Sequence, residues 1–219
     1  MLRERLERVE QRIRNAAQRA GRARSEITLI AVTKKFPAEV ICEAYGLGLR
    51  EFGENYVQEF EQKHTALARL ADARFHFIGH LQSNKARPAA EVFQVIQTVD
   101  SDKLARRLDQ AGRPLEVMIE VKLSGEQTKA GAAPEALPAL IEAIPACANL
   151  RLTGLMTMPP WSDDPEVTRP YFRRLAELGR EHKLPNLSMG MSHDLEAAIE
   201  EGATHIRIGT ALFGPRPKD

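Results

Sequence analysis

Ile27-Thr-Leu-Ile-Ala-Val-Thr-Lys34 is a run of β-branched and aliphatic residues that ends on a lysine, and Lys35-Phe-Pro37 follows it. The run predicts a buried strand, and the proline predicts the start of the next helix. A lysine at the carboxyl end of a buried strand loses hydration, which favours its neutral form. A neutral amine is the nucleophile that forms a Schiff base with an aldehyde or ketone. The alternative is that Lys34 only marks the point where the strand reaches water.

Similar apolar runs recur along the chain and alternate with helical patterns. The expected strands span residues 27–34, 49–53, 74–79, 93–99, 115–121, 150–156, 187–189 and 204–209, with a Gly/Ser loop at 124–131. Alternation of this kind predicts parallel βαβ units, and a count of eight favours an α/β fold of the closed (β/α)8 TIM-barrel type. Only ten residues follow Gly209, too few for a full eighth helix. We therefore expect an amphipathic helix over residues 1–20 to cover the gap between strands eight and one, in a single domain of residues 1–219.

Charge and composition exclude several classes of protein. The 31 basic and 30 acidic residues leave a net charge of +1, so the sequence carries no footprint for nucleic acid or membranes. The charged N-terminus lacks an apolar signal region, and no window approaches the roughly 18 apolar residues of a membrane span. Cys42, Cys147 and the six histidines form no pattern typical of a metal site. We expect a soluble, cytoplasmic protein with reduced thiols.

The site of such a barrel lies at the carboxyl ends of its strands. The residues expected there are Lys34, Asn55, His80, Met156, the segment from Ser188 through Met189 to Ser192, and Gly209-Thr210. Barrels commonly bind phosphate near strands seven and eight, where backbone N–H groups and a helix N-terminus face the anion. Ser192 is placed to cap the helix after strand seven, and Gly209-Thr210 offers close backbone approach and a hydroxyl. The alternative is that Ser192 is only a cap and Gly209 only a turn.

Arg207 lies in the middle of the last strand, between Ile206 and Ile208. Alternation along a strand places the arginine on the face opposite both isoleucines, which we expect to face the helices. Arg207 is therefore expected inside the barrel. An arginine does not deprotonate in a core, so it needs a partner there. A cofactor's ring nitrogen and a nearby acid are the two alternatives.

Six motifs together resemble the pyridoxal phosphate homeostasis protein family, in order from about residue 27 to 216. They are Ala31-Val-Thr-Lys34, Phe52-Gly-Glu-Asn-Tyr56, His76-Phe-Ile-Gly-His-Leu-Gln-Ser-Asn-Lys85, Gly154-Leu-Met156, Leu187-Ser-Met-Gly-Met-Ser192 and Arg207-Ile-Gly-Thr-Ala-Leu-Phe-Gly214. The family fold is a (β/α)8 barrel similar to the N-terminal domain of alanine racemase. The resemblance agrees with the barrel expected from the strand count.

The resemblance implies roles for the site residues. Lys34 would carry pyridoxal 5′-phosphate (PLP) as a Schiff base, and Arg207 would face the pyridine nitrogen. A guanidinium keeps that nitrogen unprotonated and weakens the ring as an electron sink. The phosphate would lie among Gly209, Thr210 and Ser192, and the ring's site would be lined by Asn55 and His80, with Met156 and Met189 packed nearby. His193 and Lys122 depart from the family pattern, beside the phosphate end and the mouth of the barrel.

Two functions follow from this resemblance. The first is a carrier that holds PLP in intracellular vitamin B6 homeostasis and amino-acid balance, with apo PLP-dependent enzymes as candidate partners and no catalytic residue of its own. The alternative is a PLP-dependent amino-acid racemase. Alanine racemase uses a tyrosine from a second domain and partner subunit as its second base. We expect no second domain in this chain, and of its three tyrosines Tyr56 and Tyr171 are expected on helices outside the barrel mouth, whereas Tyr45 is the third; this favours the carrier. The sequence shows no extended apolar surface stripe, so we expect a monomer. A cofactor-free Schiff-base aldolase ranks last because it leaves Arg207 unexplained.

Overall fold

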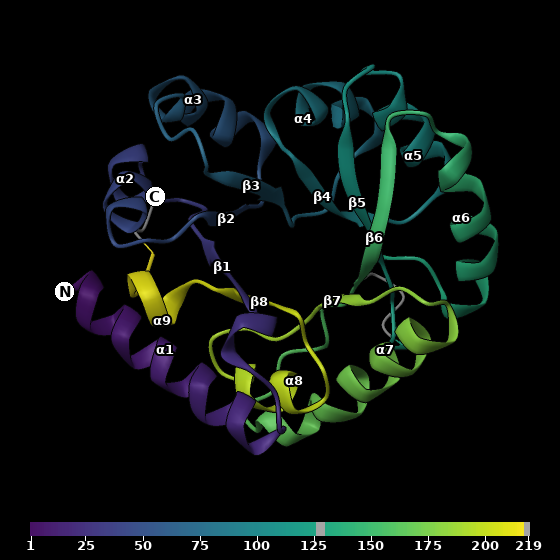
Figure 1. Cartoon of the computed structure of the whole chain (residues 1–219). Helices are drawn as coiled ribbons and strands as arrows, with labels where there is room; N and C mark the ends of the chain where they lie inside the picture. The colour runs from purple at the N-terminus through teal and green to yellow at the C-terminus, as the bar shows by residue number, and fades with distance from the viewer. Residues whose placement is uncertain (126–129, 217–219) are drawn as a thin grey trace.

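The structure is a computed structural model that describes residues 1–125 and 130–216 (Figure 1). Eight parallel strands form a closed barrel in sequence order, and β8 pairs back onto β1. The strands are β1 (Thr28–Val32), β2 (Glu51–Glu54), β3 (Arg74–Phe77), β4 (Val95–Val99), β5 (Leu115–Glu120), β6 (Leu150–Met156), β7 (Asn186–Ser188) and β8 (His205–Ile208). The predicted (β/α)8 barrel is confirmed.

Helices connect the strands and surround the barrel (Figure 1). The α-helices are α1 (Leu2–Arg19), α2 (Ala38–Gly46), α3 (Val57–Leu67), α4 (Ala86–Val92), α5 (Asp102–Asp109), α6 (Leu137–Ala143), α7 (Arg169–Glu181), α8 (Leu195–Glu200) and α9 (Thr210–Phe213). Short 3₁₀ helices are η1 (Arg24–Glu26), η2 (Ser83–Lys85), η3 (Pro134–Ala136), η4 (Ile144–Ala146) and η5 (Pro165–Val167). Part of the loop predicted at 124–131 lies outside the described residues. No helix in the described part of the chain is long and apolar enough to cross a membrane.

The N-terminal helix closes the outer layer where the last helix is too short to do so. α9 has only four residues. α1 lies beside α8 and α9 and buries Val9, Ile13 and Ala17 against them (Figure 1). Its apolar residues recur at three- and four-residue steps, so they form one stripe that faces the barrel. The predicted role of this helix is confirmed.

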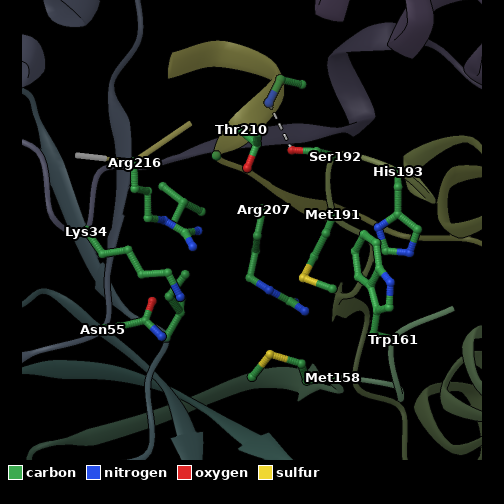
Figure 2. Close-up of a pocket in the computed structure, with 14 residues that line it drawn as sticks. Lys34, Asn55, Met158, Trp161, Met191, Ser192, His193, Arg207, Thr210 and Arg216 are labelled. Carbon is green, nitrogen blue, oxygen red and sulfur yellow. Dashed lines mark hydrogen bonds between the residues drawn. The ribbon is translucent and has the colours of Figure 1, made fainter. Parts of the chain in front are cut away.

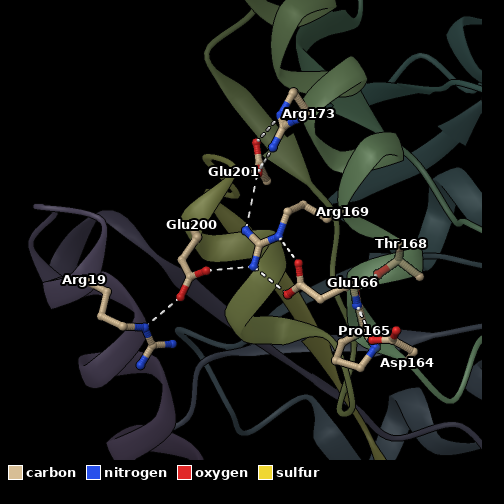
Figure 3. A network of polar contacts seen from close by, with 9 residues as sticks. All are labelled: Arg19, Asp164, Pro165, Glu166, Thr168, Arg169, Arg173, Glu200 and Glu201. Atoms are coloured by element: carbon tan, nitrogen blue, oxygen red, sulfur yellow. Dashed lines mark hydrogen bonds and ion pairs between the residues drawn. The ribbon is translucent and has the colours of Figure 1, made fainter.

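Ion pairs join α1 and α7 to α8 on the outside of the barrel (Figure 3). Arg19 Nε lies 2.7 Å from Glu200 Oε1, and Arg169 Nη2 lies 2.9 Å from Glu200 Oε2. Arg169 also pairs with Glu166 at 2.6 Å and with Glu201 at 3.3 Å. Arg169 is therefore shared by three carboxylates from two segments, which fixes α7 against α8.

The strands separate an apolar outer face from a more polar interior. Ile206 and Ile208 belong to the hydrophobic cluster that also contains the buried residues of the helices, whereas Arg207 lies between them in sequence and points into the barrel. The predicted direction of Arg207 is confirmed. β1 ends at Val32, two residues earlier than predicted, because the chain turns beyond Thr33 and Lys35 adopts a left-handed φ of 65°.

Candidate functional site

A cavity of about 600 Å³ opens at the carboxyl ends of the strands (Figure 2). Lys34 and Arg216 lie on one side of it, and Met158, Trp161 and His193 lie on the other. The described residues that line it are Val32, Lys34, Asn55, Ile78, Met158, Trp161, Met191, Ser192, His193, Arg207, Gly209, Thr210, Ala211 and Arg216. None of these is acidic and four are permanently or potentially cationic, so the cavity favours an anionic ligand.

Lys34 lies two residues beyond the end of β1, and its half-buried side chain extends into the cavity (Figure 2). Burial lowers the pKa of the Lys34 ammonium, and the positive charges of Arg216 and Arg207 lower it further, while Glu54 and Glu59 oppose the shift. A lowered pKa increases the neutral fraction of the amine near neutral pH. Lys34 is thereby suited to act as a nucleophile.

A buried polar cluster holds the turn that carries Lys34. Lys63 Nζ donates to the Thr33 carbonyl at 3.2 Å and to Glu54 Oε1 at 2.9 Å. Thr33 Oγ1 donates to the same carboxylate at 2.8 Å. Glu54 is fully buried and Lys63 almost so. The cluster ties the end of β1 to the end of β2, and thus fixes the residues immediately before Lys34 and Asn55.

Asn55 presents an unsatisfied polar atom next to the cavity. Its Oδ1 is buried and has no hydrogen-bond partner among the described residues. The backbone approaches Gly79 closely here, since a Cβ on Gly79 would lie 2.3 Å from the Asn55 carbonyl oxygen. A buried acceptor without a donor is costly, so a ligand with a hydroxyl or N–H group fits this position.

Arg207 is 4% exposed and forms part of the cavity wall. Its Nη1 donates to Ser188 Oγ at 2.8 Å and its Nη2 to the Thr157 carbonyl at 2.9 Å. Burial lowers the pKa of Arg207 to about 10, against the opposing charges of Asp194 and Glu120, so the guanidinium stays charged at neutral pH. No carboxylate within residues 1–125 and 130–216 forms an ion pair with Arg207, which leaves its charge available to a ligand.

The loop after β7 and the start of α9 meet at one end of the cavity. Ser192 Oγ accepts a hydrogen bond from the Ala211 N–H at 3.2 Å, beside Gly209 and Thr210 (Figure 2). The prediction that Ser192 caps the helix after strand seven is wrong: Asp194 occupies the N-cap position of α8, and its Oδ1 accepts from the Met191 N–H at 2.6 Å. Ser192 lies two residues before that cap, which directs its hydroxyl to α9 instead.

Arg12 of α1 hydrogen-bonds to the loop that carries Ser192. Arg12 Nη1 donates to the Ser192 carbonyl at 2.9 Å. The same guanidinium makes two bonds to Glu196 of α8, from Nε at 2.6 Å and from Nη2 at 2.7 Å. Two parallel bonds to one carboxylate fix the plane of the guanidinium. The N-terminal helix therefore contributes directly to the position of Ser192.

Six of the ten residues predicted for the site line the cavity: Lys34, Asn55, Ser192, Arg207, Gly209 and Thr210. The other four do not. His80 is exposed, Met156 and Met189 are fully buried, and Ser188 is buried and reaches the cavity only through Arg207. Met156 is the last residue of β6, so the segment that reaches the cavity is the one after it, beginning at Met158.

The sequence prediction missed Met158, Trp161 and Arg216, whereas Met191 falls in the predicted segment 188–192 and His193 was expected beside the phosphate end or the mouth. The rings of Trp161 and His193 are in contact, tilted by 46° with their centroids 3.9 Å apart, although the two residues are 32 residues apart in sequence (193 − 161). Arg216 stands two residues beyond the last motif, and its only sequence signal is that proximity. Lys122, the other residue noted as unusual, does not line the cavity, and its backbone N–H donates to the Ala132 carbonyl at 2.9 Å. None of the three tyrosines lines the cavity either.

Comparisons with known proteins agree with this geometry. The family model of the alanine racemase N-terminal domain matches residues 5–217. Alanine racemase from Corynebacterium glutamicum superposes with a TM-score of 0.67 at 17% identity over 97% of this chain and 62% of its own, which shows the fold alone. The fold and the lysine-bearing cavity thus define a barrel of the alanine racemase N-terminal type.

Relatives with higher sequence identity identify the family within this class. The pyridoxal phosphate homeostasis protein of Pseudomonas aeruginosa is 51% identical over 219 residues, covering 97% of this chain and 95% of the relative. That of Aquifex aeolicus is 47% identical over 223 residues, covering 97% of each. PipY of Synechococcus elongatus, solved with PLP bound, has a TM-score of 0.80 and 40% identity over 98% of this chain and all of its own. The chain belongs to the pyridoxal phosphate homeostasis protein family.

Proposed function

We propose that this protein binds pyridoxal 5′-phosphate on Lys34 and acts in intracellular PLP homeostasis rather than in racemisation. The observation that carries the proposal is the half-buried Lys34, with its lowered pKa, in a cavity whose described lining residues include no acid. The solved structure of PipY with PLP supports it, since that protein is 40% identical to this chain.

The side chains of the cavity fit this cofactor. PLP supplies an aldehyde carbon to which a primary amine can bond. Lys34 would supply that amine, and the orphaned Asn55 Oδ1 would accept a hydrogen bond from the cofactor. Ser192, Gly209 and Thr210 would bind the phosphate, close to the positive charge of Arg216. Arg207, which can only donate, would face the ring nitrogen.

The racemase alternative lacks a second proton carrier of the expected kind. Tyr45 hydrogen-bonds to Asp72 at the surface, Tyr56 is 49% exposed at the start of α3, and Tyr171 lies on α7. With no tyrosine among the described lining residues, the proposal is a carrier that holds a reactive aldehyde. We extend it to a single-domain monomer that works in the cytoplasm and delivers PLP to apo-enzymes.

The test is an absorption spectrum of the protein with added PLP, before and after borohydride reduction, followed by peptide mapping. We expect a visible band that borohydride abolishes and a pyridoxyl mass on Lys34 alone. Lys34→Ala should lack both. Lys35→Asn is the matched control, because asparagine tolerates the left-handed backbone at that position, and it should behave as wild type. A label on another lysine would contradict the proposal.

The single tryptophan gives a second, independent readout. Trp161 lines the cavity, so bound PLP should quench its fluorescence. The PLP-loaded protein that has not been treated with borohydride should show no conversion of L-alanine to D-alanine, and it should restore activity to an apo PLP-dependent enzyme. Measurable racemisation that Lys34→Ala abolishes would favour the racemase. Light scattering after size exclusion tests the monomer.

A further inference from the structure

A chain of hydrogen bonds runs through the barrel from the cavity to the opposite end of the strands. Arg207 Nη1 donates to Ser188 Oγ at 2.8 Å, and Ser188 Oγ donates to Gln97 Oε1 at 2.6 Å. Gln97 Nε2 contacts His76 Nδ1 at 2.9 Å, and His76 Nε2 contacts Glu51 Oε2 at 2.5 Å. Ser188 and Gln97 are fully buried and His76 is 2% exposed. The chain joins five strands: β8, β7, β4, β3 and β2.

The direction of each bond follows from the arginine. A guanidinium only donates, so Ser188 Oγ accepts from Arg207 and its one hydrogen goes to the Gln97 oxygen. The Gln97 NH2 group then faces His76 Nδ1, which must be an acceptor. His76 is therefore neutral and carries its hydrogen on Nε2, which donates to Glu51. Every polar atom along the line has a partner in this arrangement.

Protonation of His76 disrupts this order. Both ring nitrogens then donate, so Nδ1–H meets the NH2 group of Gln97 and the amide must turn over. The turned amide presents its NH2 group to Ser188, whose hydroxyl loses its acceptor in a buried environment. Arg207 would then share the Ser188 oxygen with a second donor. Protonation of His76 at the far end of the barrel thus changes the hydrogen bonding of Arg207 in the cavity wall.

The charged groups around His76 come from four strands. Glu51 of β2 touches the ring, and His205 of β8 lies with its ring centroid 6.5 Å away. Arg74 of β3 lies 3.7 Å from Glu51 and 3.0 Å from Glu116 of β5. Glu51, Arg74, Glu116 and His205 are thus the charged or titratable groups that surround the buried ring of His76. His205 stays neutral, because burial lowers its pKa to about 4.

We propose that His76 is a positioning residue for the cavity: through Gln97 and Ser188 it holds Arg207 in place, and its protonation weakens cofactor binding. This inference rests on the proposed function, because it takes PLP-type ligands as the occupants of the cavity. His76 acts at a distance and touches no ligand, since it does not line the cavity.

The test uses pyridoxine 5′-phosphate, which lacks the aldehyde and therefore binds without bonding to Lys34. Its affinity is measured by Trp161 fluorescence between about pH 8 and about pH 5.5, the range in which histidines titrate. His76→Leu should bind roughly tenfold more weakly than wild type at pH 8, which corresponds to about 1.4 kcal/mol. His76→Gln keeps a donor and an acceptor but cannot take a proton. It should bind within about twofold of wild type at pH 8 and fall less steeply on acidification.

His205→Gln is the matched control, because it removes a neighbouring histidine that is outside the chain. It should keep the wild-type pH profile. Nitrogen NMR of histidine-labelled protein without ligand gives a readout that is independent of binding. His76 should show the Nε2–H tautomer in wild type and lose that preference in Ser188→Ala, but keep it in Thr153→Val, which removes a buried hydroxyl elsewhere.

The outcomes separate the two proposals. Wild-type protein that binds neither PLP nor pyridoxine 5′-phosphate would refute the proposed function, whatever the tautomer of His76. Wild-type binding with identical pH profiles in His76→Gln would overturn the inference and leave the proposed function intact. An Nδ1–H tautomer in wild type would overturn it as well. If His76→Leu does not fold, His76→Gln and the NMR measurement still decide the question.

Discussion

Replacement of Lys63 by methionine should destabilise the protein by about 3–5 kcal/mol, because it leaves a buried carboxylate without its cation. Glu54 is 0% exposed and its Oε1 lies 2.9 Å from Lys63 Nζ, while its Oε2 has no partner among the described residues. For a chain of this length the loss corresponds to a fall in Tm of roughly 6–20 °C. The same change removes the bond to the Thr33 carbonyl, so PLP binding should weaken too.

The stability lost in Lys63→Met should depend on pH, and the direction follows from the pKa of Glu54. Burial raises the pKa of the Glu54 carboxyl, and Lys63 opposes that rise. A raised pKa means that the folded protein binds an extra proton between the unfolded and the folded value, so stability falls as pH increases through that window. Without Lys63 the pKa of Glu54 in the folded protein rises further, so this pH window extends to higher pH. Lys63→Met should therefore be less destabilised at about pH 5 than at about pH 7.5.

Urea denaturation at both pH values measures the effect. Adding Glu54→Gln to Lys63→Met removes the uncompensated charge, and should recover stability and abolish the added pH dependence. Arg87→Met is the control, because it breaks an exposed pair with Glu91 and should change stability by less than about 0.5 kcal/mol. A loss below about 1 kcal/mol, or one that is equal at both pH values, would refute the reasoning.

Three further predictions concern the cavity and the outer layer. Arg12→Ala frees the Ser192 carbonyl and should weaken PLP binding roughly threefold to tenfold in an equilibrium titration; unchanged affinity would mean that other contacts hold this loop. Because burial lowers the pKa of Lys34, the rate at which PLP attaches to Lys34 should rise with pH and level off below the ordinary lysine pKa of about 10.4. Stopped-flow absorbance measures this rate, and a plateau reached only above that pH would contradict the prediction. Arg169→Met should lower Tm by roughly 2–6 °C, and more at low salt; a loss independent of salt would exclude an electrostatic origin.

Local pattern was sufficient for the barrel and for some of the residues near its strand ends. Alternation along a strand placed Arg207 opposite Ile206 and Ile208, and the structure places it so. Lys34 and Asn55 were predicted correctly to reach the cavity because each lies within two residues of the end of a strand, where the chain must emerge at the carboxyl edge of the sheet. The exact end of β1 was not predicted, because the turn at Lys35 depends on a hydrogen bond from its backbone N–H to Glu59 of α3.

Residues on long connections could not be placed in this way. Trp161 and His193 belong to different loops, and the contact between their rings depends on how β6 and β7 pair. His80 lies three residues beyond the end of β3, whereas Asn55 follows β2 directly, and the side chain of His80 is exposed. The direction of a side chain beyond a strand is decided by the loop's own contacts, which strand periodicity does not encode.

The sequence by itself determined the order and type of the elements, the closed barrel and the lysine that follows β1, because these follow from short-range periodicity and chain connectivity. Only the tertiary structure decided which polar groups meet inside. Lys63 stands on a polar helix and looks solvent-exposed in sequence, yet it is buried against Glu54. His76 and Arg207 are 131 residues apart (207 − 76), and closure of the barrel joins them through Gln97 and Ser188. Burial makes each such contact consequential, since a polar group removed from water needs a partner that the fold alone can bring to it.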